Sequence, residues 1–580
     1  MTTFIALDLE TTGLDPETDR IVEVGAVRFD ESGERIDEFS ALVNPGRRLP
    51  VFIERLTGIS NRDLAGADRF DRLRLRLEAY LGDGVVVGHN VAFDLEFLAK
   101  AGVRWSGRSI DTAMAARVVK PGLANYGLEE VAASLGIVSE THHRALPDAR
   151  LAGRVFFELL ETVKGLPERE RRAVADVLAQ EDPAWREVLG YDERPPAEAA
   201  ALPVPRPFAA PPPLKPADRP EPVTPNDVRR VFAALADVVT GFEARPEQQE
   251  MTEAVRRAFV RGGHLMVEAG TGVGKSLAYL IPAALDAVRN GRTVVVSTHT
   301  IALQEQLVQK DIPILRAALA RAGVIDDPAS LRVVLLKGRA NYLCYARWLA
   351  GFMAGARDPE VAALAASTVR WVSLTETGDR AELRLAPDQL GAWRRLSAAD
   401  ATCLADQNRH VRAGNCFLWR ARESAKAAHI IVVNHALLLA DAVNAGSALP
   451  PFQHLIVDEA HNLEDVATTQ FGASLTPRVV SDVLDRLHRP GARDARESGI
   501  AVLLKALGTD EAAKAATKLQ EAVAASRRAA VPFFLAAGAL PGEPRDDNRI
   551  AITAAVRHRE AWERLEVAWE ALSEQFAAVG

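Results

Sequence analysis

The chain has 580 residues, of which 26% are charged and 48% are hydrophobic, and its formal net charge is −8 at pH 7. This length favours several folded domains, and the negative charge excludes a global positive field, so nucleic acid would have to bind in local grooves. No apolar run reaches transmembrane length, and Asp8 interrupts the first apolar stretch, which argues against a signal peptide. We therefore expect a cytoplasmic protein without membrane contact. Its three cysteines do not suggest a disulfide framework in a chain this large.

Residues 1–190 are expected to form the first domain. Hydrophobic patterning predicts strands at residues 4–9, 20–29, 39–43 and 85–90, and helices at 68–80, 91–100 and 149–163. Asp8 and Glu10 lie two residues apart on the first strand, so their side chains should project from the same face. Asp94 falls on the second of these helices, and Asp148 at the start of the third.

Four carboxylates brought to one site could bind two divalent cations, and oxygen ligands suit Mg²⁺ or Mn²⁺. Two such cations can activate a water molecule and stabilise the leaving oxygen when a phosphodiester is cleaved. A neutral histidine nearby can accept the proton of that water. This combination of residue types therefore points to metal-dependent phosphodiester hydrolysis.

Three motifs carry a family resemblance in this region: D-L-E-T-T-G from residue 8, G-H-N-x-x-F-D from residue 88, and H-x-x-x-x-D from residue 143. Their order resembles that of the DEDDh exonucleases, the DnaQ-like 3′→5′ group, over residues 3–165. The resemblance implies an RNase H-like domain with a mixed sheet and helices.

The same resemblance implies roles for single residues. His143 would be the general base. His142 is the alternative base, but the spacing to Asp148 selects His143. Asp111 lies outside the acidic set, and we interpret it as structural. Metal binding is implied for four carboxylates: Asp8, Glu10, Asp94 and Asp148.

Residues 191–226 form a proline-rich segment that we interpret as a linker. Proline disfavours helix and sheet, so this segment should be semi-extended. It could be a ligand for a partner that recognises polyproline, but a spacer is the favoured interpretation.

Residues 227–465 are expected to form a nucleotide-binding domain, because A-G-T-G-V-G-K-S at residues 269–276 lies between an apolar run at 264–267, predicted to be a strand, and a helical pattern. Glycines let successive backbone N–H groups face phosphate oxygens, and the following helix adds its positive end. Lys275 would reach the β- and γ-phosphates, and Ser276 would bind Mg²⁺. Alanine replaces the usual first glycine at position 269. The nucleotide-binding candidates in this loop are Gly270, Thr271, Gly272, Gly274, Lys275 and Ser276.

D-E-A-H at residues 458–461 closes a second apolar strand, predicted at 453–457. Asp458 would hold Mg²⁺ through water, Glu459 would polarise the water that attacks ATP, and His461 is a further nucleotide-site candidate. A buried parallel strand is also predicted at residues 293–298. The phosphate loop and this acidic motif together predict an ATPase half-site.

Residues 241–251 resemble the Q-motif of superfamily 2 helicases, which implies that Gln248 reads the adenine edge with Phe242 stacked nearby. In the resembled helicases, the segment after residue 297 contacts a single strand, which makes candidates of Thr298, Thr300 and Gln304. The segments 337–344, 416–422 and 428–438 resemble those of DinG/XPD-type helicases. This resemblance implies a RecA-like domain with a parallel sheet, and an insertion at residues 339–425.

In many of these relatives, four cysteines of the insertion hold a 4Fe–4S cluster. This chain offers Cys344, Cys403 and Cys416, and the missing ligand should fall near Asn408. Two interpretations stay open: a cluster held by three cysteines, with His410 as a conceivable fourth ligand, or an insertion without a cluster. We favour the second.

Residues 466–580 are predicted to be helical and resemble the start of the helical arch of these helicases. No second RecA-like domain follows, so the chain is expected to be a truncated form. The leading hypothesis is a 3′→5′ exonuclease fused to an ATP-dependent DinG-like DNA helicase that acts on single strands and 3′ ends. The alternatives are an exonuclease with an ATP-gated single-strand-binding module, and an exonuclease that trims RNA. The sequence does not predict the oligomeric state.

Overall fold

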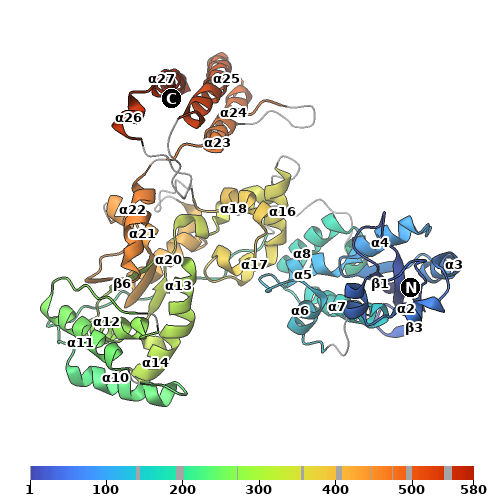
Figure 1. Cartoon of the computed structure of the whole chain (residues 1–580), viewed down its shortest axis with the longest axis horizontal. Helices are drawn as coiled ribbons and strands as arrows, with labels where there is room; N and C mark the ends of the chain where they lie inside the picture. Colours follow the sequence, from blue (N-terminus) through green and yellow to red (C-terminus); the bar gives the residue numbers. More distant parts are fainter. Residues whose placement is uncertain are drawn as a thin grey trace. The chain divides into compact units, whose positions relative to one another are not determined.

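The computed structural model describes residues 2–138, 144–190, 202–243, 245–270, 272–353, 358–399, 408–444, 446–472, 474–491, 499–540 and 552–579. The chain divides into two compact units, residues 1–463 and 464–580. Figure 1 shows the elements of both units, coloured along the sequence. Among the helices that the structure describes, none is long and apolar enough to cross a membrane.

A mixed sheet forms the centre of the N-terminal domain, as the family resemblance implies. It has five strands, one more than the sequence predicts, in the order β3-β2-β1-β4-β5. Strand β1 pairs antiparallel with β2 and parallel with β4; β3 pairs antiparallel with β2, and β5 parallel with β4. The strands are β1 (Phe4–Thr11), β2 (Ile21–Phe29), β3 (Arg35–Leu42), β4 (Val85–Gly88) and β5 (Ser109–Asp111).

Helices cover both faces of this sheet (Figure 1). They are α1 (Val51–Thr57), α2 (Asn61–Ala65), α3 (Phe70–Leu81), α4 (Val91–Lys100), α5 (Thr112–Val119), α6 (Leu128–Ser134), α7 (Ala145–Lys164), α8 (Glu168–Glu181) and α9 (Ala184–Leu189). Because side chains alternate along β1, Phe4 and Ala6 join the core that includes residues of α7, whereas Ile5 and Leu7 join the core that includes residues of α3 and α4. This alternation decides which face of the sheet carries the acidic residues further along β1.

The second sheet is parallel throughout and has the order β7-β8-β6-β9. Its strands are β6 (Val294–Thr298), β7 (Val333–Leu335), β8 (Ile430–Asn434) and β9 (His454–Val457). The helices around it are α10 (Pro225–Val238), α11 (Pro246–Arg261), α12 (Lys275–Asn290), α13 (Ile301–Gln306), α14 (Ile312–Arg321) and α21 (His435–Val443), with a π-helical turn at Leu307–Asp311. Strand β6 is buried throughout, as expected of a parallel strand with helices on both sides.

The strand predicted at residues 264–267 does not form, and this prediction is wrong. Residues 264–270 run without a ladder partner among the described strands, and the side chain of Met266 is 97% exposed. An apolar run becomes a strand only when a neighbouring strand satisfies its backbone N–H and C=O groups. In the described part of the sheet, β9 is hydrogen-bonded only to β6.

The insertion is helical, with α15 (Tyr345–Phe352), α16 (Pro359–Ser367), α17 (Val369–Leu374), α18 (Leu390–Leu396), α19 (Arg409–Arg412) and α20 (Phe417–Lys426). Trp348, Trp371 and Trp393 are buried in its core. The indole N–H of Trp348 donates to the carbonyl oxygen of Ala365 at 3.0 Å, so this buried ring also satisfies its polar atom.

The described part of the proline-rich segment is docked on the second sheet's domain and its insertion rather than acting as a free spacer. It contains neither helix nor strand up to α10, as the sequence predicts, but Leu202 is fully buried. Tyr345 donates its hydroxyl to the carbonyl of Pro203 at 2.9 Å, and Arg332 donates to that of Pro212 at 2.7 Å. The amide of Ala217 donates to the carbonyl of Asn290 at 2.9 Å.

The second unit is helical, as predicted, and its helices are α23 (Pro477–Leu487), α24 (Ile500–Ala506), α25 (Asp510–Gly538), α26 (Ala554–Arg557) and α27 (Glu560–Val579), preceded by α22 (Leu463–Phe471). Val480, Leu484, Val523 and Leu572 form its small buried core.

Candidate functional site

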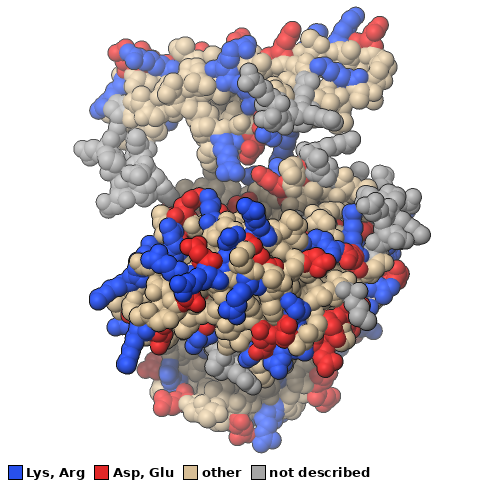
Figure 2. Space-filling view, turned by 90° about the vertical axis from the view of Figure 1, so that its right-hand side faces the viewer, with Lys and Arg blue, Asp and Glu red and all other residues tan. Residues whose placement is uncertain are grey.

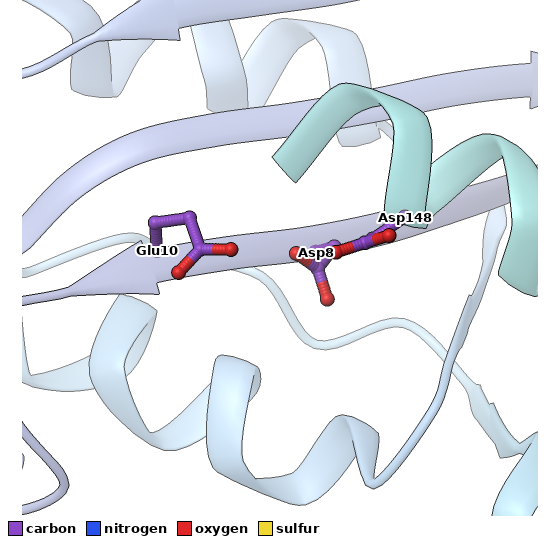
Figure 3. Close-up of side chains that lie close together, drawn as sticks. All are labelled: Asp8, Glu10 and Asp148. Atoms are coloured by element: carbon purple, nitrogen blue, oxygen red, sulfur yellow. The ribbon is translucent and has the colours of Figure 1, made fainter. Parts of the chain in front are cut away.

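Three of the four predicted metal ligands meet at the end of β1. One carboxylate oxygen from each of Asp8, Glu10 and Asp148 can be chosen so that all three lie within 4.8 Å of one another. Figure 3 shows Asp8 and Glu10 on the strand and Asp148 on helix α7 opposite them. Asp8 and Glu10 follow the same alternation as Phe4 and Ala6, which turns both carboxylates toward α7.

Asp94, the fourth predicted ligand, lies against the same strand. It is 4% exposed, and its carboxylate accepts a hydrogen bond at 3.0 Å from the amide of Leu9, the residue between Asp8 and Glu10. Asp94 therefore ties the first turn of α4 to β1 at the acidic cluster.

Burial and mutual repulsion raise the pKa values of these carboxyl groups. The pKa of Asp8 is raised well above its ordinary value by burial, and further by Asp94, Asp148 and Glu10. Burial first, and then Asp148 and Glu23, raise the pKa of Glu10 to about 7. Burial raises the pKa of Asp94 to about 8. Burial and like charges disfavour the ionised form of these carboxyl groups. A divalent cation would stabilise that ionised form, so this set of oxygen donors fits a hard metal ion.

Glu23 is a residue of this site that the sequence analysis missed. It is 2% exposed, and it lies directly across from Glu10 in the antiparallel ladder. Arg144 binds its carboxylate through two guanidinium nitrogens, the closer contact being 2.7 Å, and the amide of Ala145 donates to it at 3.0 Å. Glu23 thereby fixes the start of α7, three residues before Asp148. The sequence signal that could have identified Glu23 is its position as a charged residue inside an apolar strand.

Gly25 allows α7 to approach β2 this closely. A Cβ atom at this position would lie 2.2 Å from the carbonyl carbon of Ala145. Any side chain at residue 25 would therefore push the start of α7, and Asp148 with it, away from Asp8.

His143 and the alternative base His142 lie outside the described residues, as do Thr271 and Cys403. Asp111 caps helix α5 by accepting hydrogen bonds from the amides of Ala113 and Met114, which agrees with its structural interpretation.

The phosphate loop and the D-E-A-H motif face each other at the second sheet. Gly272 and Gly274 adopt φ values of +84° and +86°, which glycine accommodates without steric cost, and α12 begins at Lys275. The ammonium group of Lys275 lies 3.0 Å from a carboxylate oxygen of Glu459, and the hydroxyl of Tyr279 donates to Asp458 at 3.2 Å.

The other nucleotide-site candidates lie around this pair. Burial raises the pKa of Asp311, and the nearby hydroxyl of Ser276 offsets part of that rise. The imidazole of His461 lies 3.6 Å from Glu459. Gln248 is buried and donates its side-chain amide to the carbonyl of Gly274 at 2.9 Å, so it contacts the phosphate loop. Gly270 is exposed.

The three strand-contact candidates differ in exposure. Thr298 and Gln304 are buried, at 0% and 1% exposure, so neither presents a surface to a nucleic acid strand in this structure. Thr300 is exposed and caps α13 through its hydroxyl. Cys344 and Cys416 are half-buried and directly precede α15 and α20.

Family models match three parts of the chain: Exonuclease at residues 5–156, DEAD/DEAH box helicase at 245–325, and DEAD_2 at 397–480. Over most of its length the chain is similar to proteins named DinG. It is 30% identical over 493 residues to the "3'-5' exonuclease DinG" of Bacillus subtilis, which covers 82% of this chain and 51% of that protein. It is 40% identical over 270 residues to the "ATP-dependent helicase DinG" of Mycobacterium tuberculosis, covering 44% of this chain and 40% of that protein.

Among solved structures, Exonuclease X in complex with 5′ overhanging duplex DNA is 25% identical and covers 29% of this chain and 96% of that one, with a TM-score of 0.25. The chain spans about half the length, or less, of the curated DinG relatives described above.

Proposed function

We propose that this chain hydrolyses DNA from the 3′ end in a metal-dependent reaction, through the acidic cluster on β1 and α7. The observation that carries the proposal is the convergence of Asp8, Glu10 and Asp148, with ligand atoms within 4.8 Å of one another. The buried position of Asp94 beside the same strand supports it. The name of the Bacillus subtilis relative, "3'-5' exonuclease DinG", points to the same activity.

In this proposal Asp8, Glu10, Asp94 and Asp148 would hold Mg²⁺ or Mn²⁺. The cations would supply charge neutralisation and water activation at the scissile phosphate. Glu23 and Arg144 keep Asp148 in place by anchoring the start of α7. His143 would accept the proton of the attacking water, a role that rests on the family resemblance alone.

The experiment is digestion of single strands labelled at the 3′ or the 5′ end, with Mg²⁺, with Mn²⁺ and with EDTA. The expected result is immediate release of a labelled mononucleotide from the 3′-labelled strand, and a ladder of shortened products from the 5′-labelled one. Asp8→Asn keeps the shape of the side chain and should abolish release. Asp71→Asn, an exposed carboxylate in the first turn of α3, is the matched control and should leave the rate unchanged.

We propose ATP binding as a second function of the same chain, followed by hydrolysis that drives movement on DNA. The 3.0 Å pair between Lys275 and Glu459 carries this proposal, because it joins the phosphate-binding lysine to the carboxylate expected to polarise water. Strand-displacement assays with ATP test it. Binding of ATP without displacement would favour the alternative, an ATP-gated module that holds single strands.

Three further points belong to this proposal. DNA is the proposed substrate, and equal hydrolysis of matched DNA and RNA strands would instead favour RNA trimming.

A cytoplasmic location fits a protein that needs both DNA and ATP. The insertion is proposed to fold without an iron–sulfur cluster, and the buried Trp348, Trp371 and Trp393 give it a hydrophobic core.

A further inference from the structure

A pocket lined with arginine side chains opens on the nuclease domain. Its volume is about 500 Å³, and Arg47, Arg48 and Arg62 line it together with the amides of Asn44 and Asn61. The guanidinium group of Arg69 lies next to Gly46. A Cβ atom at residue 46 would be 3.1 Å from a terminal nitrogen of Arg69. The pocket is therefore polar, and the charged residues of its lining are arginines. We call it the arginine pocket.

Among these arginines, Arg47 forms an ion pair, and Arg62 acts on Asp63 at longer range. Arg47 pairs with Asp19 at 2.5 Å and donates to the carbonyl of Thr18 at 3.0 Å, which holds it in place. Arg48, Arg62 and Arg69 form no ion pair with any carboxylate in the part of the chain that the structure describes.

The acidic groups closest in sequence are already engaged. Asp63 caps α2 through Ser60, and Asp68 pairs with Arg72 at 2.9 Å. Guanidinium groups that line one concavity repel one another, so their charges do not stabilise the fold. In a protein of net charge −8, such a cluster calls for an anionic ligand.

Arg47 connects the arginine pocket to the strand that carries the acidic cluster. It donates a hydrogen bond to the hydroxyl of Thr12, two residues after Glu10.

We propose that the arginine pocket binds internucleotide phosphates of the substrate strand, upstream of the 3′ end held at the acidic cluster. The inference rests on the proposed exonuclease function and adds a subsite to it. The carboxylates that hold the metals repel the rest of a polyanionic strand, and arginine is the side chain best suited to pair with phosphate. On the face drawn in Figure 2, Lys and Arg side chains lie in groups with Asp and Glu side chains between them.

The test compares two substrates of the full chain with Mg²⁺. The p-nitrophenyl ester of thymidine 5′-monophosphate has one phosphate and reaches only the acidic cluster, whereas oligothymidylates of two to eight nucleotides extend progressively upstream. In the wild type, KM should fall as the oligonucleotide lengthens. In the double variant Arg48→Gln and Arg62→Gln, that gain with length should disappear while kcat is retained.

The magnitude follows from counterion release. Losing two phosphate contacts on a single strand changes the slope of log KM against log salt by about 1.4. The ratio of the variant's KM to the wild-type KM should therefore be about 25-fold larger at 0.1 M salt than at 1 M salt. Arg48→Lys with Arg62→Lys keeps the charges and should restore most of the affinity. Arg154→Gln with Arg186→Gln removes two exposed arginines elsewhere in the domain and should leave KM unchanged.

The outcomes separate this inference from the function on which it rests. If the wild type cleaves neither substrate, the exonuclease proposal itself fails. If both proteins cleave the ester equally and the double glutamine variant keeps the wild-type dependence on length and on salt, the arginine pocket is not a phosphate subsite. Loss of ester cleavage in that variant would place the arginines in the catalytic cluster and would also overturn the inference.

Discussion

The ammonium group of Lys275 and the carboxylate of Glu459 form an ion pair of 3.0 Å across the nucleotide site. The hydrogen bond from Lys275 is the largest cause of the lowered pKa of Glu459. Lysine in this loop is expected to pair with the phosphates of ATP, so nucleotide binding has to exchange a carboxylate for a phosphate at the same ammonium group.

Replacing Lys275 with alanine is expected to weaken ATP binding about 100-fold, because a charge-assisted hydrogen bond of up to roughly 3 kcal/mol is lost. Titration calorimetry with ATP and Mg²⁺ measures the effect. Release of 3′-terminal nucleotides should be unchanged, since the acidic cluster lies in a separate domain. An affinity within threefold of the wild-type value would contradict the assignment of Lys275 to the phosphates.

Replacing Glu459 with glutamine should have the opposite effect on ATP binding. The variant removes the competing partner of Lys275, and a partly exposed ion pair contributes at most about 1 kcal/mol, so ATP should bind up to about fivefold more tightly. The same titration tests this expectation. Hydrolysis should fall, because the carboxylate that would polarise water is gone. A weaker affinity for ATP would show that Glu459 supports the site rather than occupying it.

Asp111→Ala should destabilise α5 without affecting metal binding. The variant removes the side chain that accepts hydrogen bonds from Ala113 and Met114 at the start of the helix, at a cost of about 1 kcal/mol. Amide hydrogen exchange over residues 109–119 should become about fivefold faster, since this opening is governed by the local free energy. Asp111→Asn retains an acceptor oxygen and is the matched control. A changed affinity for Mn²⁺ would contradict the structural role.

His429 should make the helicase block less stable in acid. Burial, followed by the nearby charge of Arg332, lowers the pKa of His429 to about 4, and its ring accepts a hydrogen bond from the amide of Arg332 at 3.1 Å. The folded state therefore keeps this ring neutral, while the unfolded chain takes up a proton below its ordinary pKa of about 6.5. Between these two values, stability should fall as the pH falls, by up to about 1.4 kcal/mol per pH unit.

The measurement is the urea midpoint of the wild type and of His429→Asn at several pH values from 4.5 to 7.5. Asparagine keeps an acceptor atom near the position of the ring nitrogen but does not titrate. The difference between the two proteins should therefore shrink, or change sign, as the pH falls. A difference that stays constant across this range would show that His429 takes up a proton as readily in the folded state as in the unfolded chain.

The purified chain is expected to be colourless, without the absorbance near roughly 400 nm that thiolate-bound iron–sulfur clusters give. Trp348, Trp371 and Trp393 are buried in the insertion, and Lys337, 3% exposed in its side chain, pairs with Asp379 at 2.6 Å. Iron analysis after anaerobic purification is the check. Iron bound at a fixed ratio, and lost in Cys344→Ser, would establish a cluster with fewer cysteines than usual.

Local patterns in the sequence predicted much of the acidic cluster. Alternation along a strand is enough to place Asp8 and Glu10 on one face, and that face is the one against α7. The contact between Glu23 and Arg144 could not be predicted in the same way, because the two residues are 121 positions apart and neither belongs to a motif. The need for glycine at position 25 likewise depends on how closely α7 crosses β2.

The predictions that were incomplete or wrong concern interactions between distant segments. Residues 264–267 have the composition of a strand, yet a strand also requires a neighbouring backbone, which composition does not encode. The arginine pocket joins residues from the loop after β3 and from α2, and no spacing rule relates them. Thr298 and Gln304 follow a motif pattern, but their burial depends on the packing of α13.

The docked proline-rich segment bears on how the gene should be divided for expression. A helicase half that begins at residue 227 would discard Leu202, which is fully buried, and Phe208, whose ring lies 5.7 Å from that of Trp419. It would also leave Arg420 without the backbone carbonyl of Arg206, to which it donates at 2.6 Å. The cut that respects these contacts comes before residue 202, so a proline-rich stretch that looks dispensable in the sequence is part of the folded helicase half.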